Sequence, residues 1–410
     1  MLKKTFKIIA LILSGEVIFL LPFVITRVFR PTFLKVFDIN NFELGSAFAA
    51  YGVVAMVSYF FGGPLADRFS VRKLVTVSLI ITSFGGLFMA MIPSLVMLTI
   101  LYGFWGMTTI LLFWAAFTKA TRMAGDQDSQ GNTFGMVDGG RGLIAALLAS
   151  GSVFILGSFL PTEPDQASPE ELTHALSMVI LAFSVFTLLT SMVAWVAIDD
   201  GRTGVDTSDK MTWNGVKNVI SRPSIWKQSL ILLCAYVGYK CTDDFSLFAS
   251  EVLLFDDINS AHAATIAFWT RPFAAVGAGI LGDRAGHSKM TAVCFTIIII
   301  GSLVVYSGML KPGFEIMALL IISSTSAAIF GLRGLYYALF QESKIPLIYM
   351  GSAVGVVSVI GFTPDVFFGP MMGYILDSSP GAEGHENLFG VLSLFSLLGL
   401  MATLSFKLKP

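Results

Sequence analysis

The sequence predicts an all-α membrane protein in which twelve transmembrane helices form two pseudo-symmetric six-helix bundles. Three observations lead to this fold class. The 410-residue chain is 55% hydrophobic and only 13% charged, whereas a soluble domain carries about 25% charged residues. Apolar runs long enough to cross a bilayer recur along the chain. A short charged turn occurs twice, with Asp283 of the second copy 216 residues after Asp67 of the first, which indicates two related halves.

A helix needs about 20 apolar residues, at about 1.5 Å of rise each, to cross the hydrocarbon core. The first run follows Lys3 and Lys4 and has no clear small-residue cleavage site, so we interpret it as an uncleaved span rather than a signal peptide. The expected spans are residues 6–28, 44–66, 73–93, 95–118, 134–158, 175–198, 228–250, 261–282, 289–309, 315–340, 351–375 and 387–406. The expected domains are an N-terminal bundle at 1–198, a cytoplasmic linker at 199–227 and a C-terminal bundle at 228–410.

Lysine and arginine counts in the loops predict the orientation, because cytoplasmic loops are enriched in these residues. With the N-terminus inside, 18 of the 26 basic residues fall in inside segments. Only four fall in outside segments, namely Arg27, Arg30, Lys35 and Lys311. We therefore expect both termini, the linker and both copies of the charged turn on the cytoplasmic face.

Several classes of function lack their sequence signatures. The net charge of −1 argues against nucleic-acid binding. No phosphate-binding loop of the form Gly-x-x-x-x-Gly-Lys-Ser/Thr occurs, and no nucleophile–base pairing has a recognisable spacing. The histidines are far apart in sequence, and we expect them to be solvated surface residues: His174, His262, His287 and His385. The sequence thus predicts no catalytic residue, no metal site and no cofactor, and it predicts that its three cysteines are buried thiols.

Ionisable residues inside the predicted spans are the candidate functional residues, because charges in hydrocarbon are costly and usually face a cavity or a partner. They are Glu16, Asp138, Arg141, Lys240, Asp243, Asp244, Arg271, Arg333 and Asp365. Lys240 precedes the two aspartates by three and four residues, so all three can share a helix face and form a neutral internal pair. Asp138 and Arg141 can equally belong to a cytoplasmic charge network. Glu16, Arg271 and Arg333 have no neutralising neighbour in their own helices, which favours a cavity over structural pairing between helices.

Aromatic residues and glycines in the spans provide further candidates. Trp114, Trp269 and Tyr336 lie near the helices that carry these charges and are candidates for the lining of a polar cavity, although lipid or core packing also explains such residues. Glycines gather in span 5 and span 11, which occupy corresponding places in the two halves: Gly139, Gly140, Gly142, Gly351, Gly355, Gly361, Gly369 and Gly373. Such glycines permit close contact between helices that move against each other, or simple tight packing.

Six plus six spans, inside termini, a long linker and the repeated turn together resemble the major facilitator superfamily. Its hallmark after span 2 is Gly-x-x-x-Asp-Arg/Lys-x-Gly-x-Arg/Lys-Arg/Lys. The first copy here matches at Gly63, Asp67, Arg68, Arg72 and Lys73, with Ser70 in place of the second glycine. The second copy matches at Gly279, Asp283, Arg284, Gly286 and Lys289. The resemblance covers essentially the whole chain.

A closer resemblance is to the bacterial inner-membrane branch typified by YihN. It is carried by Gly15 with Leu21-Pro22, by Gly140-Arg141-Gly142, by Arg333 with Glu342-Ser343-Lys344, and by Gly373-Tyr374-Ile375-Leu376-Asp377. Span 5 lacks the proline of drug–proton antiporters, and span 4 lacks the central arginine of many proton-coupled members. Glu16 stands where organic-phosphate antiporters commonly have a basic residue. These departures argue against multidrug export and against organic-phosphate exchange.

The resemblance implies alternating access, in which two bundles rock about a midplane site. We expect a secondary transporter of a small solute in the bacterial inner membrane, acting as a monomer. The solute-binding candidates are Lys240, Arg271, Arg333, Trp114, Trp269 and Tyr336, because guanidinium groups suit carboxylate, phosphate or sulfonate. The proton-coupling candidates are Glu16, Asp243, Asp244 and Asp365. A cytoplasmic latch would comprise Gly63, Asp67, Arg68, Arg72, Asp138, Arg141, Gly279, Asp283 and Arg284.

Alternatives remain open at this stage. The charges near the midplane roughly balance, so a neutral or cationic solute such as a drug, a sugar or a siderophore-like compound is also compatible with the sequence. A solute sensor that signals through the linker is less favoured, because no appended signalling domain is visible. A membrane-embedded enzyme or lipid flippase is the other minor alternative.

Overall fold

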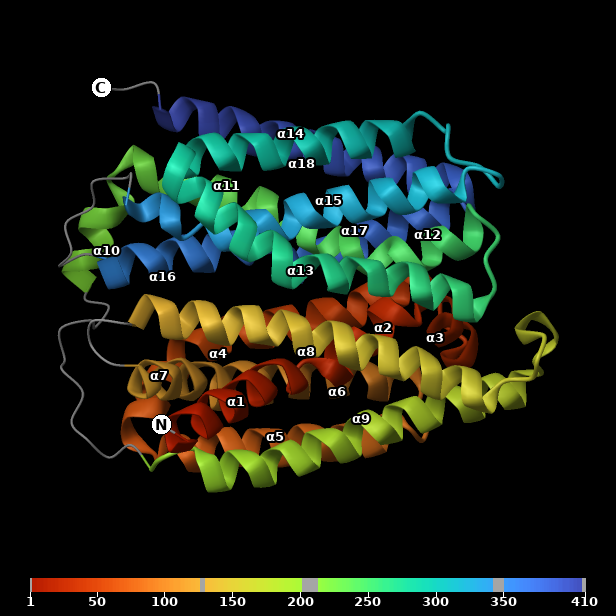
Figure 1. Cartoon of the computed structure of the whole chain (residues 1–410), viewed down its shortest axis with the longest axis horizontal. Coiled ribbons are helices and arrows are strands. Elements are labelled where there is room, and N and C mark those ends of the chain that lie inside the picture. The colour runs from red at the N-terminus through yellow and green to blue at the C-terminus, as the bar shows by residue number, and fades with distance from the viewer. Residues whose placement is uncertain (1, 126–129, 201–212, 342–349, 408–410) are drawn as a thin grey trace.

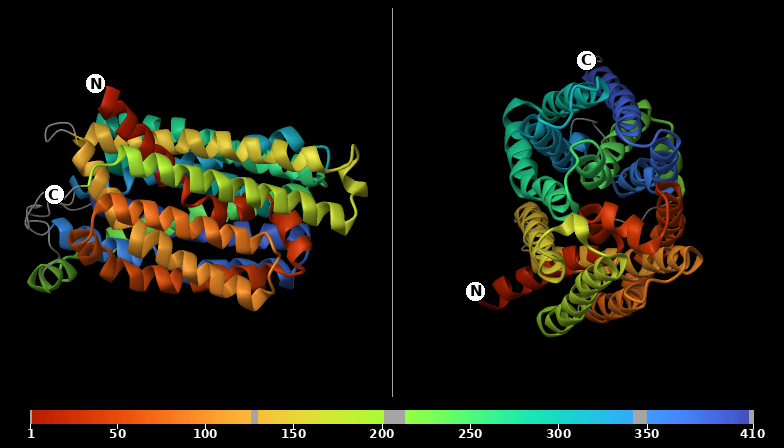
Figure 2. Two further views of the ribbon diagram at one scale, coloured as in Figure 1. Left: turned by 90° about the horizontal axis from the view of Figure 1, so that it is seen from below. Right: turned by 90° about the vertical axis from the view of Figure 1, so that its right-hand side faces the viewer.

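The computed structural model describes residues 2–125, 130–200, 213–341 and 350–407, and these residues are helical almost throughout. The helices form two layers, one from each half of the chain (Figure 1). The start of α1, the end of α18 and the short linker helix α10 all lie at one end of the molecule. Seen along the long axis, the helices of each half gather into a separate bundle (Figure 2).

The N-terminal bundle runs from α1 to α9. Its elements are α1 (Leu2–Val17), a π-helix (Leu20–Val24), α2 (Ile25–Val28), α3 (Arg30–Phe37), α4 (Asn41–Arg68), α5 (Val71–Met89), α6 (Leu95–Gly106), a π-helix (Met107–Trp114), α7 (Ala115–Ala124), α8 (Gln130–Phe159), a 3-10 helix (Pro164–Gln166) and α9 (Pro169–Ala197).

The second half begins with the linker helix α10 and continues to α18. Its elements are α10 (Trp213–Ile220), α11 (Pro223–Cys241), a 3-10 helix (Thr242–Asp244), α12 (Phe245–Glu251), α13 (Asp257–Ala285), α14 (His287–Tyr306), α15 (Glu315–Leu335), a 3-10 helix (Ala338–Gln341), α16 (Met350–Gly361), α17 (Pro364–Ser378) and α18 (Ala382–Lys407).

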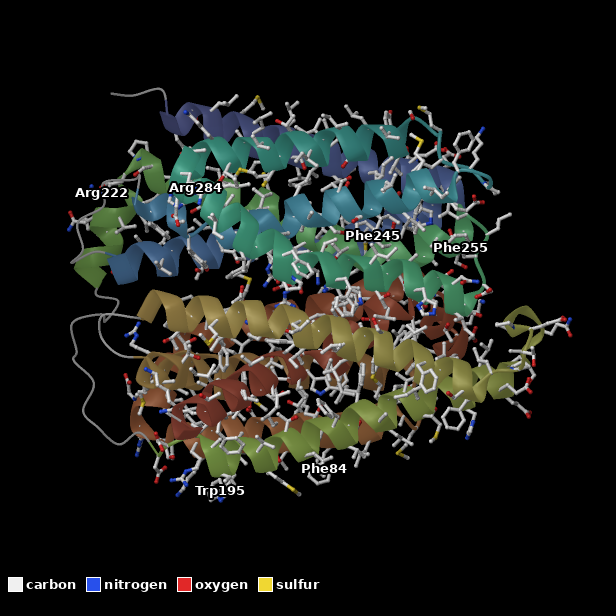
Figure 3. The ribbon with its side chains drawn as sticks, viewed as in Figure 1. Phe84, Trp195, Arg222, Phe245, Phe255 and Arg284 are labelled. Carbon is white, nitrogen blue, oxygen red and sulfur yellow. The ribbon has the colours of Figure 1, made fainter. Side chains whose placement is uncertain are left out.

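Eleven helical stretches of the described residues are long and apolar enough to cross a membrane. They coincide with eleven of the predicted spans. The remaining predicted span, at 228–250, is built from α11, the 3-10 turn and α12, and it carries Lys240, Asp243 and Asp244. These charges and the break at Thr242–Asp244 separate it from an ordinary apolar span. Large apolar side chains such as Phe84 and Trp195 point outward from the bundle, as a lipid-facing surface requires (Figure 3).

The two bundles meet along two helix pairs, α4 with α17 and α8 with α13. The 216-residue offset relates α4 to α13, and spans 5 and 11 correspond in the same way, so the internal symmetry exchanges the two pairs. Along the first pair the backbones nearly touch: a Cβ built on Gly45 would lie 2.2 Å from the carbonyl oxygen of Gly369. A Cβ on Gly373 would lie 2.3 Å from the carbonyl oxygen of Asn41. The predicted close contacts of Gly369 and Gly373 are therefore present.

We expect Gly45→Ala to disfavour this close packing, because the new methyl group would overlap backbone that has no freedom to retreat within the helix. Overpacking of this kind costs about 1–3 kcal/mol. In the Gly45→Ala variant, distances measured by double electron–electron resonance between spin labels at Glu170 and Lys311 should lengthen. These two residues lie at the end of the molecule remote from the termini. Gly277→Ala is the matched control, since a Cβ there meets nothing within 4 Å. Unchanged distances in Gly45→Ala would contradict this account of the α4–α17 interface.

Candidate functional site: a cavity between the bundles

A cavity of about 1310 Å³ lies between the two bundles and is lined by both. Along α4 its lining runs from Tyr51 to Asp67, which is about 24 Å at 1.5 Å per residue. Asp67 is exposed at the end of α4. The cavity thus reaches the end of the molecule that carries the charged turns and both termini, where Arg222 and Arg284 also lie (Figure 3). We call this end the open end.

The opposite end is held shut by hydrogen bonds between the bundles, and we call it the closed end. The carboxylate of Asp377 on α17 accepts three hydrogen bonds from the start of α4. The donors are the backbone N–H groups of Asn41 at 3.1 Å and of Phe42 at 2.7 Å, and the side-chain amide of Asn41 at 3.1 Å. The first N–H groups of a helix lack partners within the helix and favour an anion. Asp257 of α13 accepts hydrogen bonds from Thr32 at 3.0 Å and from Lys35 at 3.1 Å.

We expect Asp377→Ala to weaken the closed end, because three hydrogen bonds to one carboxylate would be lost. A shift of at least tenfold in the open-to-closed ratio at this end corresponds to about 1.4 kcal/mol. The measurement is the spin-label distance between Glu170 and Lys311, as above. Glu383→Ala is the control, since Glu383 is an exposed acid in the first turn of α18, which begins at the closed end. An unaltered distance distribution in Asp377→Ala would rule out this carboxylate as a clasp.

The first group of cavity charges is centred on Glu16, which α1 places at mid-depth. Its carboxylate accepts hydrogen bonds from Nη1 and Nη2 of Arg271 at 2.8 and 3.1 Å, and this bidentate ion pair joins the two bundles. Nε of Arg141 lies 3.3 Å from the same carboxylate, and Nη1 of Arg141 lies 3.3 Å from Asp138. The side chain of Glu16 is only 5% exposed, so both arginines are needed to compensate its burial.

The second group lies deeper, around the break between α11 and α12. Arg27 on α2 donates to Asp243 at 2.5 Å, and both side chains are almost fully buried. Nζ of Lys240 lies 3.4 Å from Asp243 and 3.6 Å from Asp365. The hydroxyl of Tyr236 donates to the Asp365 carboxylate at 2.9 Å. Lys240 and Asp243 therefore pair as the sequence predicts, but through a network that also joins the two bundles.

Arg333, in the last turn of α15, differs from the other cavity cations. Its guanidinium lies over the ring of Tyr239, 4.1 Å from the ring centroid. Within the described residues no carboxylate lies within salt-bridge distance of it. The side chain lines the cavity and is partly exposed to it.

The structure brings most of the predicted binding residues together. Seven of them line the cavity: Glu16, Trp114, Lys240, Arg271, Arg333, Tyr336 and Asp365. Trp269 does not line the cavity. Its indole donates to Ser150 at 3.0 Å across the α8–α13 pair, and 39% of the residue is exposed. Asp244 also points elsewhere, because the 3-10 turn rotates it away from Lys240 and toward His385. The expectation that all three charges near Lys240 share one face is thus wrong for Asp244.

The predicted latch residues stay within their own bundles in this structure. Asp67 pairs with Lys119 at 3.2 Å, Arg72 with Asp200 at 3.5 Å, and Asp283 with His287 at 3.1 Å. Arg68 lies over Phe69, and Gly63 and Gly279 have room for a Cβ. Asp138 and Arg141 pair with each other, and Arg141 lines the cavity. Arg284 lies at the open end (Figure 3). A latch across the bundles would form only when the open end closes, so it stays a prediction.

Two corrections concern residues that the sequence places at the surface. Arg27 and Arg30 were expected in an outer loop, but they are 5% and 0% exposed. The chain stays helical through α2 and α3, which places Arg27 against Asp243 and Arg30 against Ser246 of the other bundle. His385 was expected to be solvated, but it is fully buried between Asp244 and Glu251. Moving the two arginines inward leaves two basic residues in outer loops and so strengthens the predicted charge bias.

Comparison with known proteins gives matches along the whole chain. A family model described as Major Facilitator Superfamily matches residues 12–364. Inner membrane protein YqcE of Escherichia coli strain K12 is 27% identical over 406 residues, which cover 96% of this chain and 92% of YqcE. Inner membrane protein YihN of the same organism is 23% identical over 414 residues, which cover 98% of this chain and 95% of YihN.

Two solved structures share the fold. The nucleoside transporter NupG superposes with a TM-score of 0.72 at 13% identity, covering 99% of this chain and 100% of NupG. A bacterial homologue of the human lysosomal transporter Spinster, in an inward-facing and unoccupied conformation, superposes with a TM-score of 0.71 at 16% identity. That match covers 100% of this chain and 99% of the homologue. Identities this low establish the fold alone.

Proposed function

Because the chain belongs to the major facilitator superfamily, we propose that it moves a small organic anion across the inner membrane by alternating access. The chain is a multi-pass inner membrane protein and a secondary transporter, not an enzyme. We further propose that the solute is negatively charged, that cavity residues bind it and that protons are the coupling ion.

The charge balance of the cavity supports an anionic solute. Five cations lie at or beside its deep part, namely Arg27, Arg141, Lys240, Arg271 and Arg333. They face four carboxylates, those of Glu16, Asp138, Asp243 and Asp365. The surplus is one positive charge, and Arg333 is the cation without a carboxylate partner among the described residues. The observation that carries the proposal is therefore the guanidinium of Arg333, which lines a cavity between the bundles and has no carboxylate within ion-pair distance in the described part of the chain.

The lining also indicates an organic rather than an inorganic anion. Aromatic side chains surround Arg333 and the deep part of the cavity: Phe23, Trp114, Tyr236, Tyr239, Tyr336, Tyr337 and Phe362. A guanidinium fork suits a carboxylate, phosphate or sulfonate, while aromatic faces suit an apolar body. The cavity is larger than the roughly 300–1000 Å³ of pockets that enclose drug-sized ligands, as expected for a vestibule still open to water.

We assign the open end to the cytoplasm, so that the structure represents an inward-facing state. The loop charges support this orientation, and the shape resembles a transporter solved in an inward-facing conformation. The cavity carboxylates of Glu16 and Asp365 are the proposed proton-coupling groups at the solute site. A solute anion that approaches Lys240 or Arg271 would compete with these carboxylates for the same cations, so binding and protonation are linked.

A binding screen tests the proposed solute class. Purified protein is heated in the presence of matched pairs, each an aromatic or aliphatic monocarboxylate and its neutral amide. At least one acid should raise the unfolding temperature, and its amide should not. Sugars, amines and siderophore-like compounds are included, and stabilisation by one of these with none by any anion would contradict an anionic solute.

A further inference from the structure

We propose that Glu251, His385 and Asp244 form a proton-binding site at the closed end, separate from the cavity and loaded from that face through Glu251. The inference rests on the proposed function only for the use of this proton in transport. The site itself is defined by its geometry.

The geometry of His385 requires an extra proton. Nδ1 lies 2.8 Å from Oδ2 of Asp244, and Nε2 lies 3.1 Å from Oε2 of Glu251. A neutral imidazole has one N–H and one bare nitrogen, and an ionised carboxylate can only accept. Two nitrogen–carboxylate contacts therefore need two protons, of which a neutral ring supplies one. We assign the second to the ring, so that His385 is an imidazolium between two carboxylates.

The three residues lead from solvent into the protein interior. The side chain of Glu251 is 36% exposed at the end of α12, whereas the side chains of His385 and Asp244 are 0% exposed. A proton that reaches Glu251 from water can move to Nε2, which makes the imidazolium. The Nδ1 proton can then move to Asp244, which leaves a neutral ring with its proton on Nε2. Before loading, the three side chains share one proton, which lies on Nδ1. Uptake through Glu251 raises the number to two, and it stays at two until Asp244 releases one.

Asp244 connects this site to the contact between the bundles. Its Oδ1 atom is buried without a hydrogen-bond partner in the described part of the chain, and so are both Nη atoms of Arg30 on α3. The backbone N–H of Arg30 donates to Oγ of Ser246 at 3.3 Å, two residues after Asp244, so Arg30 lies beside the turn that carries Asp244. Arg30 belongs to the N-terminal bundle, so its positive charge leaves Asp244 when the closed end opens. Opening would then favour the protonated site, and closing would favour release.

The other ionisable neighbours do not supply this proton. Asp243 is paired with Arg27 and Lys240, and Cys241 is a buried thiol on α11. Phe248 packs edge-on against the His385 ring. Glu386 follows His385 in sequence, but its carboxylate lies beside Gly308. Glu386 is therefore a matched control acid on the same helix.

Nitrogen-15 NMR of histidine-labelled protein, with no solute added, tests the proposal. The ring resonance that disappears in His385→Gln should show both nitrogens protonated at pH 7. Exchange of its N–H protons with water should slow at least tenfold in Glu251→Gln and remain unchanged in Glu386→Gln. Glu251 is partly exposed, so this variant should fold, and a monodisperse elution profile checks it.

Two results would overturn the proposal: one bare ring nitrogen in His385 at pH 7, or exchange in Glu251→Gln within twofold of the wild type. Because the experiment contains no solute, a failure here leaves the anion proposal standing. Failure of the anion screen likewise leaves the NMR result untouched.

Discussion

Replacing Asp243 by alanine is expected to destabilise the closed end by about 3–5 kcal/mol, the cost of leaving a buried charge unpaired. Arg27 is 5% exposed, and Asp243 is the carboxylate within ion-pair distance of it in the described residues. Opening the closed end would let Arg27 reach water, so the Asp243→Ala variant should populate that state. Spin-label distances between Glu170 and Lys311 should lengthen, and those between the exposed residues Lys73 and Lys289 at the open end should shorten.

A second variant separates this effect from general damage. The double variant Arg27→Met/Asp243→Leu removes both charges and fills the space with apolar side chains, so it should recover most of the closed population. Replacement of a whole buried pair by apolar residues is often neutral or stabilising. If the double variant is as open as Asp243→Ala, the pair is not what holds this end. If Asp243→Ala leaves both distances unchanged, the Arg27–Asp243 contact has no part in closure.

Replacing Arg333 by alanine is expected to weaken binding of the anion found in the screen by about 10–100-fold. A hydrogen bond to a charged group contributes about 1.5–3 kcal/mol, and a guanidinium can donate two. The stability of the unliganded protein should change little, because Arg333 forms no salt bridge with the described residues. Isothermal titration of the same anion with wild type and variant measures the difference.

Arg333→Lys and Arg222→Ala sharpen that comparison. Lysine keeps the charge but loses the fork, so its affinity should fall between those of the wild type and Arg333→Ala. Arg222 lies at the open end outside the cavity lining, and its loss should leave affinity unchanged. An Arg333→Ala variant with wild-type affinity for the anion would place the binding charge elsewhere.

The fold could be predicted from simple patterns in the sequence. Run length, the linker and the repeated turn predict spans and bundles, because the bilayer imposes a minimum helix length and the duplication imposes a spacing. The membership in the major facilitator superfamily and the two inner-membrane relatives confirm this prediction. The breaks at Leu20–Val24, Met107–Trp114 and Thr242–Asp244 were not predicted, since local hydropathy does not distinguish them from regular helix.

The ionisable residues of the cavity could be named from the sequence, but their partners could not. Glu16 and Arg271 are 255 residues apart, and only the meeting of the bundles joins them. His385 depends on acids 141 and 134 residues away, so nothing near it in sequence distinguishes it from a surface histidine.

The sequence contains one signal that places Arg27 between the bundles. The 216-residue offset that aligns the two charged turns also relates Arg27 to Asp243 and Arg30 to Ser246. Residues at equivalent positions near a two-fold axis contact each other. Applying the offset to Asp243 would have moved Arg27 from the outer loop into the contact between the bundles.

Counterflow in proteoliposomes would show whether the protein carries an organic anion across the bilayer. Vesicles loaded with the unlabelled anion from the screen are diluted into a trace of the same anion carrying a radioactive label. We expect transient accumulation of label in wild-type vesicles, little in Arg333→Ala vesicles, and none of the labelled neutral amide in either. Accumulation of the amide to the same extent as the acid, or no accumulation of any anion that the protein binds, would contradict it.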